Sequence, residues 1–248
     1  FHSFSHHTSF SATNEDTCLV NINNRTETSA NNLGSATKLL ITFGTSFVYY
    51  LNKTGEVVAN CHKLPAGNFT HKRLSVTEIV NDWDLLLSGL FENNSELRII
   101  FTVSPIRYWK YGAHESQLSK STLLLAIDEL QKQYPEQISY FPAYELMMDE
   151  LRDYRFYAED MCHPSVIAIR YIWERFTQTY MNLPTLQILK EIENILRLTN
   201  NKPFNPRSES YKQFVTQTLL KIEQFNDNRP CLCFKKEIEI LKKNIKDK

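Results

Sequence analysis

The run Lys38-Leu-Leu-Ile-Thr-Phe-Gly44 decides the fold class of this chain. It is apolar almost throughout and ends in glycine, a composition typical of strands buried on both faces of a parallel sheet. Two further runs of this kind follow at residues 97–103 and 137–141. Three strands of this type predict a parallel sheet, with the strand at 38–44 coming first along the chain.

Helical patterns separate these strands, at about residues 75–91 and 115–133. Ser75 and Glu78 form a capping box that marks the start of the first helix. A strand–helix–strand–helix order is the rhythm of a parallel sheet with crossover helices, so we predict an α/β fold. A hairpin around residues 52–55 is expected between the first strand and the first helix.

The strand at 38–44 also raises the question of its neighbours. With three parallel strands readable, this strand would lie near a bare sheet edge, where an apolar run is an aggregation hazard. The loop-rich residues 1–37, with one short helix expected near 16–28, supply no strand to cover it. We therefore expect an N-terminally incomplete α/β domain over residues 1–183.

The remainder of the chain, residues 184–248, has a different character. Amphipathic helices are predicted at about 184–199, 208–226 and 235–246, separated by breaks rich in Asn and Pro. We interpret this part as an α-helical extension, either a cap on the first domain or a surface for a partner.

Composition excludes several classes of function. Lys plus Arg and Asp plus Glu number 28 each, so no net field recruits nucleic acid or an anionic membrane. Six glycines and the absence of a Gly-rich phosphate loop argue against a nucleotide cofactor, and we expect no cofactor. Cys231 and Cys233 lack a second ligand pair, so we expect two half-buried thiols there and no metal site. No apolar run reaches the roughly 20 residues that span a bilayer, and no signal peptide is visible, so a cytoplasmic location is expected.

The segment most informative about chemistry contains Asp160, two intervening residues and His163, followed by Pro164. Because Pro favours the first turn of a helix, we predict His163 at a helix N-terminus, where the dipole favours a neutral imidazole. Asp160 can then accept a hydrogen bond from one ring nitrogen while the other accepts a proton. The alternative is a helix-capping histidine beside a surface aspartate.

Several longer runs are similar to the GSCFA family of bacterial proteins, which is grouped with the SGNH hydrolases. The resemblance covers roughly residues 1–180. The runs that carry it are Phe1-His-Ser-Phe-Ser-His-His-Thr-Ser-Phe10, Leu40-Ile-Thr-Phe-Gly-Thr-Ser-Phe-Val-Tyr49, Val57-Val-Ala-Asn-Cys-His-Lys-Leu-Pro65, Thr102-Val-Ser-Pro-Ile-Arg107, Gln117-Leu-Ser-Lys120 and Tyr140-Phe-Pro-Ala-Tyr-Glu-Leu-Met-Met-Asp-Glu-Leu-Arg-Asp-Tyr-Arg-Phe-Tyr-Ala-Glu-Asp160.

The resemblance implies a three-layer α/β/α domain with a parallel, flavodoxin-like sheet. It also implies that Asp160 and His163 are the last catalytic block of an ester hydrolase or acyltransferase. Glycine and asparagine donors would line the oxyanion hole, for which Gly44 and Asn60 are the candidates; a turn glycine and a hairpin-end asparagine are the alternatives.

Two further residues are candidates for substrate binding. His62 could face a substrate or lie at an exposed hairpin end, and Arg107 could clamp an anionic group or pair with an acidic neighbour. The expected substrate is a small-molecule or carbohydrate ester.

One family feature is missing, since the Gly-Ser-Cys-Phe-Ala motif that should hold the serine nucleophile does not occur in these residues. We assign no nucleophile, although Ser46 would be the first residue to test. The rival hypothesis is a non-catalytic binding or scaffold protein with a partner-binding helical tail. The sequence leaves the oligomeric state open.

Overall fold

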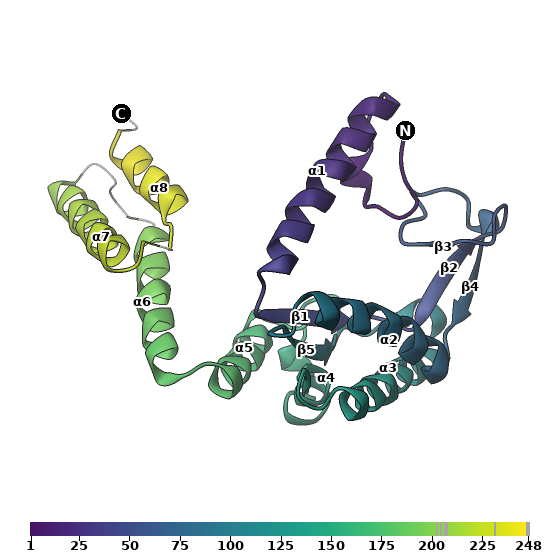
Figure 1. Cartoon of the computed structure of the whole chain (residues 1–248). Helices are drawn as coiled ribbons and strands as arrows, with labels where there is room; N and C mark the ends of the chain where they lie inside the picture. The colour runs from purple at the N-terminus through teal and green to yellow at the C-terminus, as the bar shows by residue number, and fades with distance from the viewer. Residues whose placement is uncertain (202, 204, 206–207, 231, 247–248) are drawn as a thin grey trace. The chain divides into compact units, whose positions relative to one another are not determined.

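The computed structural model describes residues 1–201, 203, 205, 208–230 and 232–246 (Figure 1). The chain divides into two compact units, Phe1–Trp173 and Glu174–Lys248. The first unit contains two small β-sheets with helices, and the second is helical. The predicted α/β class with a helical C-terminal region is confirmed.

The central sheet of the first unit consists of β1 (Lys38–Phe43), β5 (Arg98–Val103) and β6 (Ile138–Phe141). Its order is β1-β5-β6 and both pairings are parallel. Within the described residues β1 pairs only with β5, and Leu40 on this edge strand is 51% exposed. Because all three strands are parallel, their carboxyl ends lie side by side along one side of the sheet, called here its carboxyl edge.

Two helices pack on one face of this sheet, α2 (Val76–Asn93) and α3 (Ala113–Gln133). Alternate strand residues, including Ile99, Phe101 and Val103 of β5, point toward them and form the main core. Helix α2 begins with the predicted capping box, in which Ser75 and Glu78 bond reciprocally. These contacts fix α3 beside the carboxyl edge of the sheet.

A second, antiparallel sheet follows β1 directly. It contains β2 (Phe47–Leu51), β3 (Val57–Val58) and β4 (Phe69–Arg73), in the order β3-β2-β4. The predicted hairpin is confirmed, with Gly55 at φ +73° in its turn, a conformation that glycine tolerates. β4 was not predicted from the sequence.

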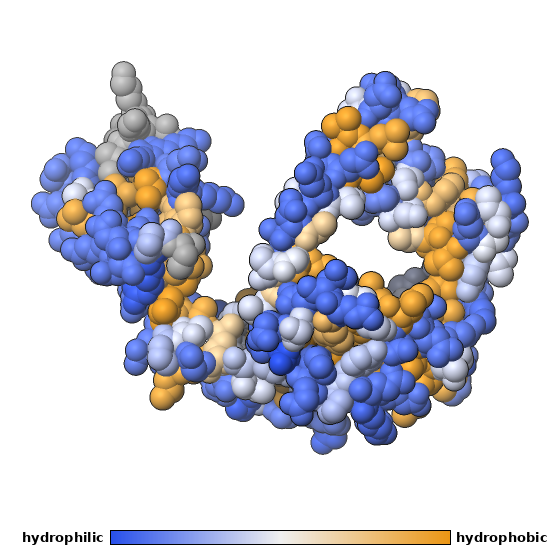
Figure 2. Space-filling view, viewed as in Figure 1, coloured by the Kyte–Doolittle hydropathy of each residue, from blue (hydrophilic) through white to orange (hydrophobic). Residues whose placement is uncertain are grey.

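The N-terminal segment contains a 3-10 turn, η1 (Thr8–Phe10), and then α1 (Glu15–Gly34). This helix is longer than the predicted segment 16–28. Only Cys18 is buried in it, and its surface is largely hydrophilic with an apolar patch toward its N-terminal end (Figure 2).

The chain after β6 forms α4 (Ala143–Glu145), a π-helical turn η4 (Leu146–Glu150) and then α5 (Val166–Tyr180). A small cluster of Met147, Leu151, Tyr157 and Ala168 holds this part together. Shorter 3-10 turns lie at Ala66–Asn68 (η2), Trp109–Tyr111 (η3) and Tyr154–Phe156 (η5).

The second unit contains α6 (Leu183–Thr199), α7 (Glu209–Asn228) and α8 (Lys235–Lys246), close to the three predicted helices. Its own core includes Ile195, Val215, Ile222, Phe225 and Leu241. Among the described residues, no helix combines the length and the apolar character that a membrane span requires.

Candidate functional site

The loop between Ala158 and Pro164 brings the predicted pair together. Nδ1 of His163 and Oδ2 of Asp160 lie 2.5 Å apart. The other carboxylate oxygen, Oδ1, accepts the backbone N–H groups of Cys162 and His163, each at 2.9 Å. These backbone bonds, and then the bond from the imidazole, lower the pKa of the Asp160 carboxyl to about 2. Asp160 is therefore a fixed carboxylate at any pH near neutrality.

This arrangement determines which nitrogen of His163 can accept a proton. An ionised carboxylate only accepts hydrogen bonds, so Nδ1 of a neutral His163 carries the proton. In the part of the chain that the structure describes, nothing is hydrogen-bonded to Nε2. Both side chains are about half exposed, 57% for His163 and 51% for Asp160. The Nε2 lone pair is thus accessible to a substrate or another group.

The start of the following helix differs from the prediction. α5 begins at Val166, after Ser165, whose hydroxyl accepts the N–H of Ala168. Pro164 is not in the first turn; it forms an isolated antiparallel bridge with Tyr157. His163 consequently precedes the helix, and its orientation comes from Asp160 and this bridge, with little help from the helix dipole.

One side-chain contact fixes the loop at the carboxyl edge of the sheet. The thiol of Cys162 donates to the carbonyl of Arg107 at 2.7 Å. Arg107 lies in the segment that leaves β5 at its carboxyl end. The aspartate–histidine pair is therefore located beside the segment that leaves the central strand, where ligands bind in open α/β sheets.

Arg107 itself is held by aromatic rings. Its guanidinium lies 4.2 Å from the ring centroid of Tyr157 and 5.7 Å from those of Trp109 and Tyr154. The alternative of an acidic partner finds no support, because no ion pair among the described residues includes Arg107. Cation–π contacts orient this group while leaving its N–H donors in the plane of the guanidinium.

Gly44 follows β1 at the same sheet edge, and the residue that contacts it was not predicted. Nζ of Lys120, on α3, donates to the carbonyl of Gly44 at 2.6 Å and to that of Ser104 at 2.7 Å. Lys120 is only 3% exposed, and burial lowers its pKa to about 8. The burial of Lys120 could have been predicted from the sequence, because Lys120 lies one helical turn before Leu123 and two before Ile127, both buried on the core face of α3.

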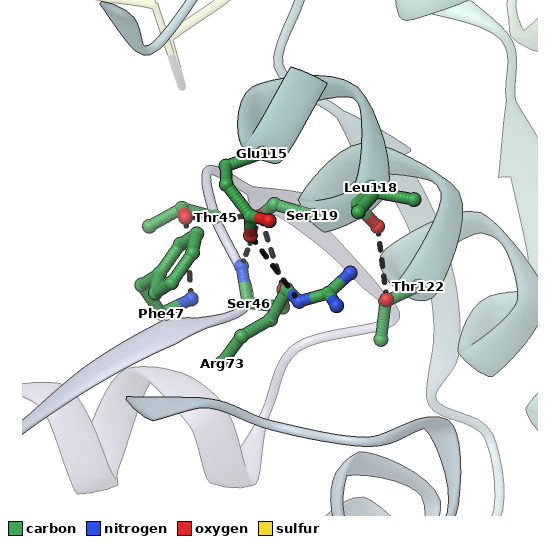
Figure 3. Close-up of polar contacts among 8 residues, drawn as sticks. All are labelled: Thr45, Ser46, Phe47, Arg73, Glu115, Leu118, Ser119 and Thr122. Carbon is green, nitrogen blue, oxygen red and sulfur yellow. Dashed lines mark hydrogen bonds and ion pairs between the residues drawn. The ribbon is translucent and has the colours of Figure 1, made fainter. Parts of the chain in front are cut away.

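The residue before Lys120 ties α3 to the turn after β1 (Figure 3). Oγ of Ser119 accepts the backbone N–H of Ser46 at 2.8 Å and the Ser46 hydroxyl at 3.0 Å. Thr45 Oγ1 lies 3.0 Å from the same oxygen. Ser46 is 2% exposed, so its hydroxyl is a structural donor that a substrate cannot reach.

Asn60 and His62 face the N-terminal segment. The side-chain NH₂ group of Asn60 donates to Thr8 Oγ1 at 3.2 Å. The side-chain oxygen Oδ1 of Asn60 accepts the backbone N–H of His62. Nε2 of the His62 ring lies 2.8 Å from the Ser3 carbonyl oxygen. The His62 ring also contacts the His2 ring, with centroids 4.3 Å apart and the ring planes tilted by 37°. No contact among the described residues brings either side chain to Asp160 or His163, so both assigned roles stay predictions.

Of the two C-terminal cysteines considered as metal ligands, Cys231 lies outside the described residues. Among these residues no group of three or more His, Cys, Asp or Glu side chains is arranged to hold a metal ion.

Comparisons with known proteins identify the family. The model of the GSCFA family matches residues 1–176, and that of the GSCFA domain protein, C-terminal domain, matches residues 192–247. No curated protein and no solved structure matches the chain. Since the first family model covers most of the chain, including the Asp160–His163 loop, this protein belongs to the GSCFA family.

Proposed function

We propose that this protein is an SGNH-type ester hydrolase or acyltransferase in which Asp160 and His163 supply the base. The observation that carries the proposal is the hydrogen bond between Asp160 and Nδ1 of His163, with Nε2 directed to no described residue. An imidazole fixed in this tautomer by a carboxylate is the base-and-orienter part of a triad.

The reaction needs a serine, which in this proposal lies outside residues 1–248. Its hydroxyl attacks the ester carbonyl, and Nε2 of His163 takes the hydroxyl proton. The tetrahedral intermediate collapses as His163 returns that proton to the leaving alcohol, leaving an acyl-enzyme. Water, or an acceptor alcohol in a transferase, repeats the sequence and releases the serine. Asp160 stays ionised throughout and stabilises the imidazolium.

Gly44 and Asn60 are the proposed oxyanion donors. The open surroundings of Gly44 support its role, because a Cβ built at this exposed residue would have no described atom within 4 Å. A developing oxyanion could therefore approach its backbone closely. Asn60 would need its second amide N–H for this purpose, since the first is directed at Thr8.

The proposed substrate is a small-molecule or O-acetylated carbohydrate ester, and the proposed location is the cytoplasm. Arg107 would contact the substrate, since its guanidinium is oriented by rings and has no described acidic partner. Aromatic residues beside it suit a sugar ring, which stacks on such surfaces. His62 would have to leave its contact with Ser3 to contribute.

The test is ester hydrolysis by the product of the whole open reading frame, assayed with p-nitrophenyl acetate and an acetylated sugar. We expect turnover that His163→Ala removes and Asp160→Asn reduces by orders of magnitude. His114→Ala, an exposed histidine on α3, is the control and should retain activity. Full activity in His163→Ala would refute the proposal.

A second candidate function is partner binding by the helical unit. It is supported by a cavity of about 270 Å³ between α6 and α7, lined by apolar and charged groups including Glu191, Phe225 and Arg229. Co-purification of a partner that Lys221→Glu releases, from a protein inactive on esters, would favour it, because Lys221 lines this cavity and its side chain is exposed.

A further inference from the structure

A cavity of about 220 Å³ lies beside the first turns of α3, inside the first unit. Its walls come from the segment after β5, from α3, and from α4 and η4. The lining residues that matter for its chemistry are Arg107, Trp109, Ser116, Gln117, Lys120 and Tyr144. Because the Cys162 thiol bonds the Arg107 carbonyl, the Asp160–His163 loop contacts the segment that forms this wall.

The cavity carries two positive charges and no negative one. Arg107 and Lys120 both line it, and none of its lining residues is acidic. Neither cation takes part in an ion pair among the described residues. Glu115 is the one acidic residue in the first turn of α3, and it pairs with another cation: its Oε2 lies 3.7 Å from Nε of Arg73. Two cations without a counter-charge in a partly enclosed space create a strongly positive site.

Lys120 is the less expected of the two. A buried ammonium is costly unless it is paired, and here its described partners are two neutral carbonyls and the ring of Tyr144, whose centroid lies 5.9 Å from Nζ. Of its three N–H donors, two are used by Gly44 and Ser104 within the described residues, so one remains. Burial lowers the pKa of this lysine to about 8, as expected for a cation that lacks an anionic partner.

A third donor faces the same space. The Tyr144 hydroxyl donates to Oε1 of Gln117 at 2.6 Å, which fixes the orientation of that amide. The NH₂ group of Gln117 is then left as a donor. Arg107 and Lys120 thus supply charged hydrogen-bond donors and Gln117 a neutral one, and no carboxylate among the lining residues competes for them.

We infer that this cavity binds the oxyanion of a small molecule, a carboxylate or a phosphate-like group. Arg107 supplies a planar pair of donors suited to either group, and Lys120 supplies a buried point charge. That the anion belongs to the substrate of the Asp160–His163 loop rests on the proposed function; the binding itself does not.

The experiment titrates the product of the whole open reading frame with sodium sulfate and, separately, with sodium acetate at constant ionic strength, following amide resonances by NMR. Sulfate represents a tetrahedral anion and acetate a planar one, so the tighter ligand identifies the group. We expect saturable shifts at Gln117 and Lys120, and Arg107→Gln should weaken binding about tenfold or more. Lys110→Gln removes a neighbouring charge that does not line the cavity and should leave affinity within about twofold.

A pH series tests Lys120 without the risk that its replacement unfolds the protein. Neither sulfate nor acetate changes charge between pH 7 and 9, and Arg107 stays protonated. Among the described residues, the titratable groups that face Lys120 are the Cys162 thiol and the Tyr144 hydroxyl, and burial raises the pKa of Tyr144. Binding should weaken as the pH rises through about 8, where Lys120 loses its charge, and a Cys162→Ser variant should show the same pH dependence. Absence of saturable binding, equal losses in Arg107→Gln and Lys110→Gln, or affinity independent of pH would each overturn the inference.

One variant separates this inference from the proposed function. His163→Ala should bind the anion as the parent chain does, while hydrolysis by the product of the whole open reading frame is lost. Anion binding without any esterase activity would refute the ester chemistry alone. Esterase activity without anion binding would refute the cavity assignment alone.

Discussion

Replacing Ser119 with alanine should loosen the turn that follows β1. The Ser119 oxygen holds the Ser46 N–H at 2.8 Å and the Ser46 hydroxyl at 3.0 Å, and both serines are 2% exposed (Figure 3). Alanine would leave a buried backbone donor without a partner, which costs about 1–3 kcal/mol. We expect the free energy of opening at this turn to fall by about 2 kcal/mol, because rotation of the hydroxyls offsets part of the loss.

Hydrogen exchange at the Ser46 amide measures this effect directly. A loss of about 2 kcal/mol accelerates exchange about thirtyfold where opening controls it. Thr122→Val on the same helix is the control, because among the described residues the Thr122 hydroxyl bonds only the Leu118 carbonyl, one turn earlier. Its loss should change stability by about 0.5 kcal/mol or less.

Two results would refute this reasoning. Unchanged exchange at Ser46 in Ser119→Ala would mean that the hydrogen bond does not protect the amide. Equal acceleration in Thr122→Val would mean that any lost hydroxyl on α3 has the same effect, and that Ser119 does not anchor the turn beside Gly44.

Three further predictions concern single groups. The carboxyl of Asp160 should have a pKa of about 2, below its ordinary value of 3.8. Its contribution to stability is therefore fully present above pH 3.8 and is lost as the pH falls through about 2. A midpoint near 3.8 in a ¹³C NMR titration would contradict the hydrogen bonds from the backbone to this carboxylate. The ring of His163 should carry its proton on Nδ1 at high pH, which ¹⁵N NMR reports, and Asp160→Asn should shift this tautomer toward Nε2–H. Ser75→Ala should lower the stability of the first unit by about 1 kcal/mol in urea unfolding, since it removes the cap of α2; an unchanged midpoint would show that the cap is dispensable.

Local sequence patterns were sufficient for most of the fold. The apolar runs predicted the strands β1, β5 and β6, and the Ser75–Glu78 box marked the start of α2. Each of these signals depends on neighbouring residues alone. Burial on both faces is found in β5 but not in β1, whose residues alternate between exposed and half-buried. The sequence also predicted that β1 would lack a neighbouring strand, and within the described residues β1 is an edge strand.

Other elements could not be predicted because tertiary contacts determine them. β4 is Phe-Thr-His-Lys-Arg, a polar segment that becomes a strand because β2 pairs with it. Pro164 favoured an earlier start for α5, but its bridge with Tyr157 delays the helix to Val166.

In the candidate site, too, one contact could be predicted from the sequence and another could not. Asp160 and His163 are three residues apart, so their contact was readable from the sequence. Lys120 contacts Gly44 and Ser104, residues distant along the chain, and only the folded arrangement of α3 reveals that contact.

The most direct test of the Asp160–His163 assignment is labelling by a fluorophosphonate, which reacts only with a serine that a base has activated. It should be applied to the product of the whole open reading frame and to its His163→Ala variant, with folding of both checked by circular dichroism. We predict labelling of the parent protein and none of His163→Ala, because the serine would lose the base that activates it. The variant should still fold, since His163 lies in an exposed loop outside the core. Labelling that survives His163→Ala would contradict the assignment and remove the Asp160–His163 pair from the mechanism.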